Sequence, residues 1–250
     1  NIFNNKHEVN AILGVSSELE KGDYTATRLT GYDAYNHDFA TTAAVGAGNS
    51  TDYKKSLFSY FMRVNYAYDD KYLASVSIRR DGSSVFGKNN KYGSFPAISL
   101  GWNVHNEDFL SQSEVINKLK VRASLGVTGT NDLRLASFNV LNDDVLVNYY
   151  PSTPLLSDNT YDSNASIYAL NIANPDLKWE RSIEINPGID FGLFNNIISG
   201  SFDYYKRTSD QLLLNNPVST TTGFGNALVN IGEVENSGIE IELRSRNLSK

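Results

Sequence analysis

The stretch that decides the fold is residues 58–68, which read FSYFMRVNYAY. Every even position in it is apolar or aromatic, whereas the odd positions include Ser59, Arg63 and Asn65. Side chains on a strand alternate between two faces with a period of two, whereas one face of a helix recurs about every 3.6 residues. This stretch is therefore predicted to be a β-strand with one apolar face and one polar face.

The same period continues along the chain in both directions. It predicts eight strands, with the approximate bounds 6–20, 54–68, 71–81, 92–104, 118–128, 178–193, 196–210 and 237–247. Many of these are longer than the five or six residues that are typical of strands in soluble proteins. We see no convincing helix; residues 111–118 have only a weak helical pattern. The predicted fold class is all-β, an antiparallel up-and-down meander.

The connections between these strands alternate in length, which bears on the architecture. The compact ones are 69–70, 105–117 and 195–196, and the remaining ones are 21–53, 82–91, 129–177 and 213–236. In a meander, alternate connections lie on the same edge of the sheet, so the long ones share one edge. Outer-membrane β-barrels have this asymmetry, with short periplasmic turns and long extracellular loops. We expect long extracellular loops at about 21–53, 129–177 and 213–236.

The two faces predict two environments. Aromatic residues on the apolar face are expected where a bilayer meets water, and they are Tyr66, Tyr68, Tyr72, Trp102, Trp179 and Phe191. Polar residues on the opposite face are expected to line a lumen, and they are Arg63, Arg79, Arg122, Glu184, Asp190, Glu240 and Glu242. Alternation alone also fits a soluble β-sandwich, whose apolar face is its core.

Composition excludes several classes of function. The 250 residues carry 22 basic and 28 acidic side chains, a formal net charge of −6, which argues against a nucleic-acid partner. Without cysteine, the chain has no disulfide, Cys-zinc site or thiol nucleophile. No run approaches 18 apolar residues, so no transmembrane helix is predicted. The histidines His7, His37 and His105 lack the spacing of a metal site, and we expect no cofactor.

Several motifs resemble one family. Residues 64–87, VNYAYDDKYLASVSIRRDGSSVFG, begin a segment up to residue 110 that resembles the C-terminal barrel of SusC/RagA-like TonB-linked outer-membrane proteins of the Bacteroidota. The segments KLKVRASLGVTGTN (118–131), NPDLKWE at the start of 174–214, and TTGFGNALVNIGEVENSG at the start of 221–243 resemble the segments that follow in that family. The motifs occur in the order of the family.

The resemblance implies that residues 1–250 are part of a barrel of about 22 strands, without the plug domain, the TonB box and the other strands. It implies an active transporter in the outer membrane that imports oligosaccharides or peptides. Its implied partners are the lipid bilayer, a SusD-like surface lipoprotein over the long loops, and the TonB–ExbB–ExbD complex, which acts through the missing N-terminal region.

Candidate site residues lie in one long connection. Tyr149, Tyr150, Tyr161 and Tyr168 have aromatic faces that suit sugar or peptide binding, although packing of the loop is the alternative for each. Other functions remain open at this point: a soluble or surface all-β carbohydrate-binding module, and an all-β hydrolase that uses the carboxylate pairs Glu233/Glu235 and Glu240/Glu242. The hydrolase has no supporting catalytic constellation, so the chain is not expected to be an enzyme.

Overall fold

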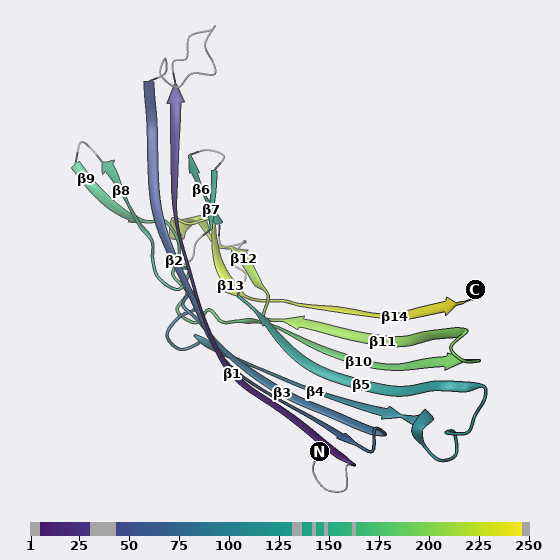
Figure 1. The fold of residues 1–250 in the computed structure, drawn as a ribbon. Helices are drawn as coiled ribbons and strands as arrows, with labels where there is room; N and C mark the ends of the chain where they lie inside the picture. Colours follow the sequence, from purple (N-terminus) through teal and green to yellow (C-terminus); the bar gives the residue numbers. More distant parts are fainter. Residues whose placement is uncertain are drawn as a thin grey trace.

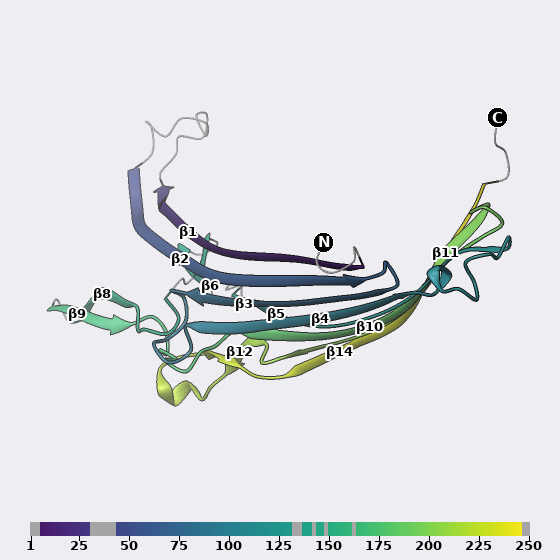
Figure 2. The same cartoon turned by 60° about the horizontal axis from the view of Figure 1, so that its bottom comes forward.

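The computed structural model describes residues 6–30, 44–131, 137–141, 144–147, 150–161 and 164–246. Eight strands form one antiparallel sheet in chain order, β1-β2-β3-β4-β5-β10-β11-β14. Their bounds are His7–Thr30, Ala44–Tyr68, Tyr72–Ser83, Tyr92–Asn103, Ile116–Thr130, Glu180–Leu193, Ile198–Asp210 and Glu233–Ser245. The sheet is a curved, open trough (Figures 1 and 2). The predicted eight-stranded meander is confirmed, and the sheet does not close on itself.

Three compact connections share one edge of the sheet, which we call the short-turn edge. Asp69 and Asp70 have φ of 51°, and Phe194, Asn195 and Asn196 have φ between 52° and 60°. Asp and Asn tolerate this left-handed conformation better than other residues with a side chain, so they suit tight hairpins. The connection between β4 and β5 begins with a 3₁₀ turn, η2 (Val104–Asn106). No helix in the described part of the chain is long and apolar enough to cross a membrane.

The first hairpin is longer than its sequence predicts. β1 has 24 residues and β2 has 25, and they pair as far as Thr30 with Ala44. Residues 21–30 and 44–53, which we expected in a loop, therefore continue these strands. Strand β3 pairs with β2 only as far as Leu57 with Ser83, so the rest of the hairpin projects beyond the sheet (Figure 1). A ribbon outside the sheet has no reason to keep one apolar face, which explains why the alternation ends there.

The other long connections contain short hairpins, which the sequence pattern does not reveal. They pair β6 (Ser137–Leu141) with β7 (Asp144–Val147), β8 (Leu156–Tyr161) with β9 (Asn164–Ala169), and β12 (Leu213–Pro217) with β13 (Asn226–Asn230). A second 3₁₀ turn, η3 (Thr220–Thr222), lies between β12 and β13. All three hairpins gather at the long-connection edge, opposite the short turns (Figures 1 and 2).

One face of the sheet, the apolar face, is exposed although it is rich in large hydrophobic side chains. Val76, Leu100, Leu125 and Ile189 are 50%, 56%, 43% and 41% exposed, respectively. A soluble sandwich needs a second layer of protein over these residues. No element of the described chain covers them, so the described residues do not form the two-layer core that the soluble alternative requires.

The buried apolar residues lie instead at the long-connection edge, in a group that we call the loop-base cluster. Its members are Val85, Phe86, Leu177, Trp179, Leu213 and Leu228, with Leu57 and Phe95 packed against it. The Trp179 ring lies 5.1 Å from Phe86 and 5.4 Å from Phe95, centroid to centroid. The cluster joins segments from three connections, those between β3 and β4, β5 and β10, and β11 and β14, so it fixes the bases of these loops.

Trp179 corrects one prediction. We expected it among the lipid-interface aromatics, but it is only 7% exposed and its indole N–H donates to the Lys91 carbonyl at 3.0 Å. Strand β10 begins at Glu180, so the alternation of that strand does not extend to Trp179. The ring is therefore free to turn into the loop-base cluster.

Candidate functional site

The polar face of the sheet carries a trough floored by small side chains. The register places Arg63, Ser77, Ala97, Gly126 and Glu184 in one row across five neighbouring strands. Ser75, Ser99 and Ser124 form the next row toward the short-turn edge. The residues in the middle of these rows have short side chains or none. The longer side chains at the ends, such as Arg63 and Glu184, therefore stand above them. Two adjoining grooves of about 380 and 360 Å³ result, and we call them together the polar trough.

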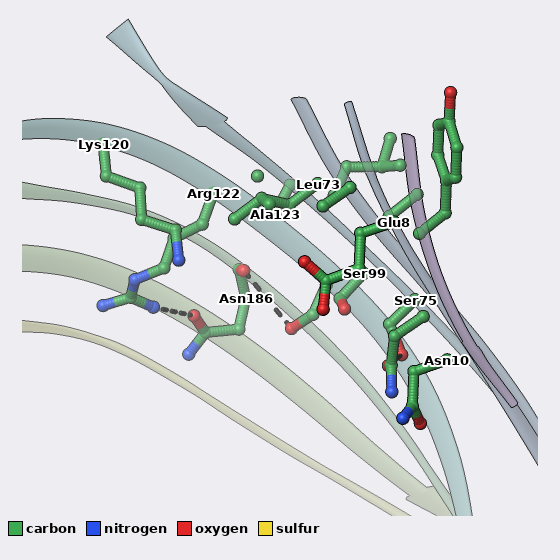
Figure 3. Close-up of a pocket in the computed structure, with 16 residues that line it drawn as sticks. Glu8, Asn10, Leu73, Ser75, Ser99, Lys120, Arg122, Ala123 and Asn186 are labelled. Carbon is green, nitrogen blue, oxygen red and sulfur yellow. Dashed lines mark hydrogen bonds between the residues drawn. The ribbon is translucent and has the colours of Figure 1, made fainter. Parts of the chain in front are cut away.

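Figure 3 shows the first groove, with Asn10, Ser75, Ser99 and Asn186 contributed by different strands and with Lys120 and Arg122 at one end. Amides, hydroxyls and charged groups share this lining with apolar residues such as Ala67 and Leu73. Such a wall offers hydrogen bonds to a polar ligand or to a polar protein surface. In the second groove, Arg63, Glu184 and Arg207 have no ion pair with another described residue.

Arg122 is the centre of the main ionic network on this face. Its Nη1 lies 2.7 Å from Asp203 Oδ1 and its Nη2 lies 3.2 Å from Asp190 Oδ1. The same guanidinium approaches Asn186 Oδ1 at 3.5 Å (Figure 3). Charge-assisted bonds of this kind are the stronger hydrogen bonds in proteins. They tie β5 to β10 and β11, so the predicted residues Arg122 and Asp190 are brought together.

Gly188 makes this network possible. Arg122 reaches Asp203 across β10, and the strand passes beneath the ion pair at Gly188. A Cβ at Gly188 would lie 2.3 Å from Asp203 Oδ1 and 2.9 Å from the Arg122 guanidinium carbon. Pro187 precedes it, and the β10–β11 pairing is interrupted there because proline has no N–H to donate.

The other predicted polar-face residues do not join this network. Arg79 donates to Asp81 at 2.7 Å and to the Ser59 hydroxyl at 2.9 Å, nearer the long-connection edge. Glu242 pairs with Arg244 of its own strand at 2.6 Å. Glu240 lies on the polar face opposite Asp203 on the edge strand β14, and it is exposed.

The aromatic residues at the short-turn edge form a stack on the apolar face. Tyr72 stacks on Tyr68 and on Trp102, each pair with centroids 6.3 Å apart. The polar ends of two of these rings meet Glu107, which accepts from the Tyr72 hydroxyl at 2.7 Å and from the Trp102 indole N–H at 3.0 Å. Tyr66 and Phe191 lie on the same face, so they, Tyr68, Tyr72 and Trp102 keep the face that the alternation predicts.

The groups around Glu107 also stabilise its charged form. The Lys71 ammonium lies 3.2 Å from its second oxygen. Hydrogen bonds, first from Tyr72 and then from Trp102, hold the pKa of the Glu107 carboxyl below its ordinary value. The bond to Glu107 in turn raises the pKa of Lys71. The carboxylate is therefore ionised at neutral pH and fixes both rings.

The four tyrosines predicted to contact substrate do not form a single site in the described structure. Tyr149 lies outside the described residues, and Tyr161 ends β8 without a described side chain. The Tyr150 hydroxyl accepts from the Lys54 backbone N–H at 2.9 Å, so it fastens its loop to β2. Tyr168 lies on β9 and is half-exposed, on a hairpin that extends away from the sheet (Figure 2).

Two important residues escaped the sequence reasoning. The alternation places Asp203 on the polar face of its strand. It does not reveal the pairing with Arg122, because that residue is 81 positions away in the sequence. Glu107 lies in an irregular connection, where no periodic signal exists. Within the described ranges, no group of three or more His, Asp or Glu residues is arranged to hold a metal ion.

Comparison with known proteins identifies the family. A family model described as "TonB dependent receptor-like, beta-barrel" matches residues 2–249. TonB-dependent receptor P39 of Formosa agariphila is 36% identical over 98% of this chain and 22% of that protein. TonB-dependent receptor SusC of Bacteroides thetaiotaomicron is 37% identical over 77% of this chain and 19% of that protein. The chain thus spans about a fifth of the length of these relatives.

Solved structures agree with this assignment. The RagAB peptide importer in its closed-closed state superposes with a TM-score of 0.81 and 25% identity, over 98% of this chain and 26% of that chain. A siderophore receptor of Acinetobacter baumannii, PirA, has a TM-score of 0.53 at 14% identity, a likeness of fold alone. Both sequence relatives are TonB-dependent receptors. The chain belongs to the TonB-dependent receptor β-barrel family and forms part of its barrel, as the SusC/RagA resemblance predicts.

Proposed function

We propose that these residues form part of the membrane wall of an outer-membrane, TonB-dependent active transporter that imports nutrients. The observation that carries the proposal is the apolar face, whose large hydrophobic residues recur at every second position and remain exposed. Hydrocarbon is the environment in which such a face is stable, provided that the remaining strands close the barrel and satisfy the edge N–H and C=O groups. Those strands would come from the rest of the receptor, since the chain spans about a fifth of the length of its relatives.

In this proposal the polar trough faces the lumen. The residues predicted for the polar face line this wall of the barrel, within the trough at Arg63, Arg122 and Glu184 and beside it at Arg79, Asp190, Glu240 and Glu242. The network around Arg122 stiffens this wall. Arg63 and Glu184, which have no ion pair within the described chain, offer charges to the plug or to a passing solute.

The substrate class that we propose is oligosaccharides or peptides, and the partners are a SusD-like surface lipoprotein and the TonB–ExbB–ExbD complex. The long-connection edge, where three hairpins gather, is the face on which the lipoprotein would sit. Two of the four candidate tyrosines have described side chains. Tyr168 is half-exposed and available to a ligand at this edge, whereas Tyr150 positions its loop. The substrate class is tested by growth on single oligosaccharides and on peptides. A strain that lacks the receptor is compared with the same strain after the receptor has been restored.

The membrane assignment has a matched pair of variants on one strand. Val76→Arg places a charge on the apolar face and is expected to cost about 2–4 kcal/mol if that face meets the middle of the bilayer. Ser77→Arg places the same charge on the polar face, one residue away. Extraction of the complete receptor from outer membranes, followed by electrophoresis with and without heating, measures the folded fraction. Loss of the folded band for Val76→Arg alone supports the proposal, and equal assembly of both variants would contradict it.

A further inference from the structure

The apolar face has a groove close to the short-turn edge, and the strand register explains it. The row that runs through β2, β3, β4, β5 and β10 consists of Tyr66, Ala74, Leu100, Ala123 and Pro187. Ala74 and Ala123 are the small members of this row. The next row toward the turns is uniformly large, with Tyr72, Trp102 and Val121. A groove of about 370 Å³ lies among these side chains.

The lining of this groove suits a hydrocarbon chain. Its side chains on this face are the two alanines, Leu100, Val121 and the aromatic rings of Tyr66, Tyr72 and Trp102. Protein surfaces lose dispersion contacts wherever a gap is left unfilled. In a bilayer, a methylene chain lying along Ala74 and Ala123 supplies those contacts.

The end of the groove at the short turns is polar and carries an excess of negative charge. The turn before β3 and the connection after β4 are joined, because Asn103 and Asn106 both donate to the Asp70 carbonyl, at 2.7 and 3.0 Å. Four carboxylates gather on these segments, at Asp69, Asp70, Glu107 and Asp108. They are accompanied by two ammonium groups, Lys6, which pairs with Asp69, and Lys71, which pairs with Glu107.

Asp108 can receive a further cation, and it directly follows Glu107, which bonds the Tyr72 and Trp102 rings that line the groove. Its side chain is fully exposed, at 102%, and its single described ion pair, with Lys71, is long at 3.5 Å. Glu107, by contrast, is already occupied by Tyr72, Trp102 and Lys71. An incoming ammonium group would therefore be attracted to Asp108, and an anionic group would be repelled by the excess charge.

We propose that this groove binds one acyl chain of a phospholipid whose headgroup ends in a primary ammonium group, with that ammonium beside Asp108. The inference rests on the proposed function, since it requires the apolar face to lie in the membrane. Phosphatidylethanolamine has the required chemistry. Phosphatidylglycerol has the same chains but a net negative headgroup, so it separates the effect of the chain from that of the headgroup.

Native mass spectrometry of the complete receptor in detergent, titrated with each lipid, tests the site. The double variant Ala74→Leu, Ala123→Leu fills the groove and is expected to weaken phosphatidylethanolamine binding at least fivefold. Val76→Leu adds a methylene on the same strand and face, outside the groove, and is expected to leave binding unchanged. Asp108→Asn should remove most of the preference for phosphatidylethanolamine over phosphatidylglycerol. Because the Asp108 side chain is fully exposed, this variant should assemble normally.

The outcomes separate this inference from the proposal on which it rests. Unchanged phosphatidylethanolamine binding in the groove-filled variant, or equal binding of both lipids to the unaltered receptor, overturns the lipid site. If the groove-filled variant does not assemble, Asp108→Asn alone decides, and an unaltered lipid preference overturns the site. Normal assembly of Val76→Arg, by contrast, overturns the membrane assignment itself.

Discussion

The two tryptophans of this chain show how differently its two edges are built. Trp102 lies at the short-turn edge, 38% exposed on the apolar face, with its N–H on Glu107. Trp179 lies at the long-connection edge, 7% exposed, within the loop-base cluster. The first ring is available to an apolar surrounding, whereas the second is enclosed by the chain itself. One edge is therefore suited to contact the membrane interface, and the other holds loops together.

The largest expected effect concerns Trp179. Trp179→Ala removes the ring that packs on Phe86 and Phe95 and is expected to cost about 3–5 kcal/mol of unfolding free energy. Trp102→Ala removes a half-exposed ring and one hydrogen bond, and is expected to cost about 1 kcal/mol. Urea unfolding of the complete receptor in lipid vesicles measures both. Equal costs would erase the contrast between the two edges.

A smaller effect is expected at Gly188, and it has opposite sign at a matched glycine. Gly188→Ala drives a methyl group into the Arg122–Asp203 pair and is expected to destabilise the barrel by about 1–3 kcal/mol. A Cβ at Gly126, also on the polar face, lies 3.6 Å from Ala97, an ordinary contact. Gly126→Ala is therefore expected to stabilise by about 0.5–1 kcal/mol, because glycine loses more chain entropy on folding.

Those two variants are measured by the same urea titration. A destabilised Gly126→Ala variant together with a neutral Gly188→Ala variant would contradict this prediction. It would show that the Arg122–Asp203 ion pair does not need the space that the missing Cβ of Gly188 leaves. The ionic network would then not be a fixed part of the wall.

The smallest effect belongs to the short-turn edge and depends on pH. Because the pKa of Glu107 is lowered in the folded chain, its stabilisation is present above the ordinary carboxyl pKa of about 4.3 and is lost as pH falls through the folded value. Glu107→Gln should be less stable than the unaltered receptor at pH 7, with the difference shrinking at acid pH. A difference that stays constant down to pH 3 would exclude the ionised carboxylate as the cause.

The sequence alone predicts the eight main strands and which face each side chain takes, because alternation is a local property of a strand. It places Val76 and Leu100 on one face and Arg122 and Asp190 on the other, as the register confirms. Where the alternation ends, the prediction fails. Trp179 precedes its strand by one residue, and its burial depends on the distant residues Phe86 and Phe95.

The candidate site was predictable only in part, for a related reason. Strand pairing brings Arg122 within reach of Asp203, and no local pattern contains the register of three strands. The long hairpin β1–β2 was missed beyond residue 20, because a ribbon outside the sheet has no apolar face to mark it. Glu107 depends on a 3₁₀ turn and two packed connections, which carry no periodic signal.

The most direct test of the central claim, that hydrocarbon covers the apolar face, is a label scan along β3. The chain has no cysteine, so single cysteines at positions 74 to 79 of an otherwise cysteine-free receptor can each carry a spin label. Collision rates with oxygen and with a water-soluble nickel complex are then measured in membranes. We predict oxygen-rich values at Ala74, Val76 and Ile78, and nickel-rich values at Ser75, Ser77 and Arg79. Values without a period of two, or with the two sets exchanged, would contradict the account.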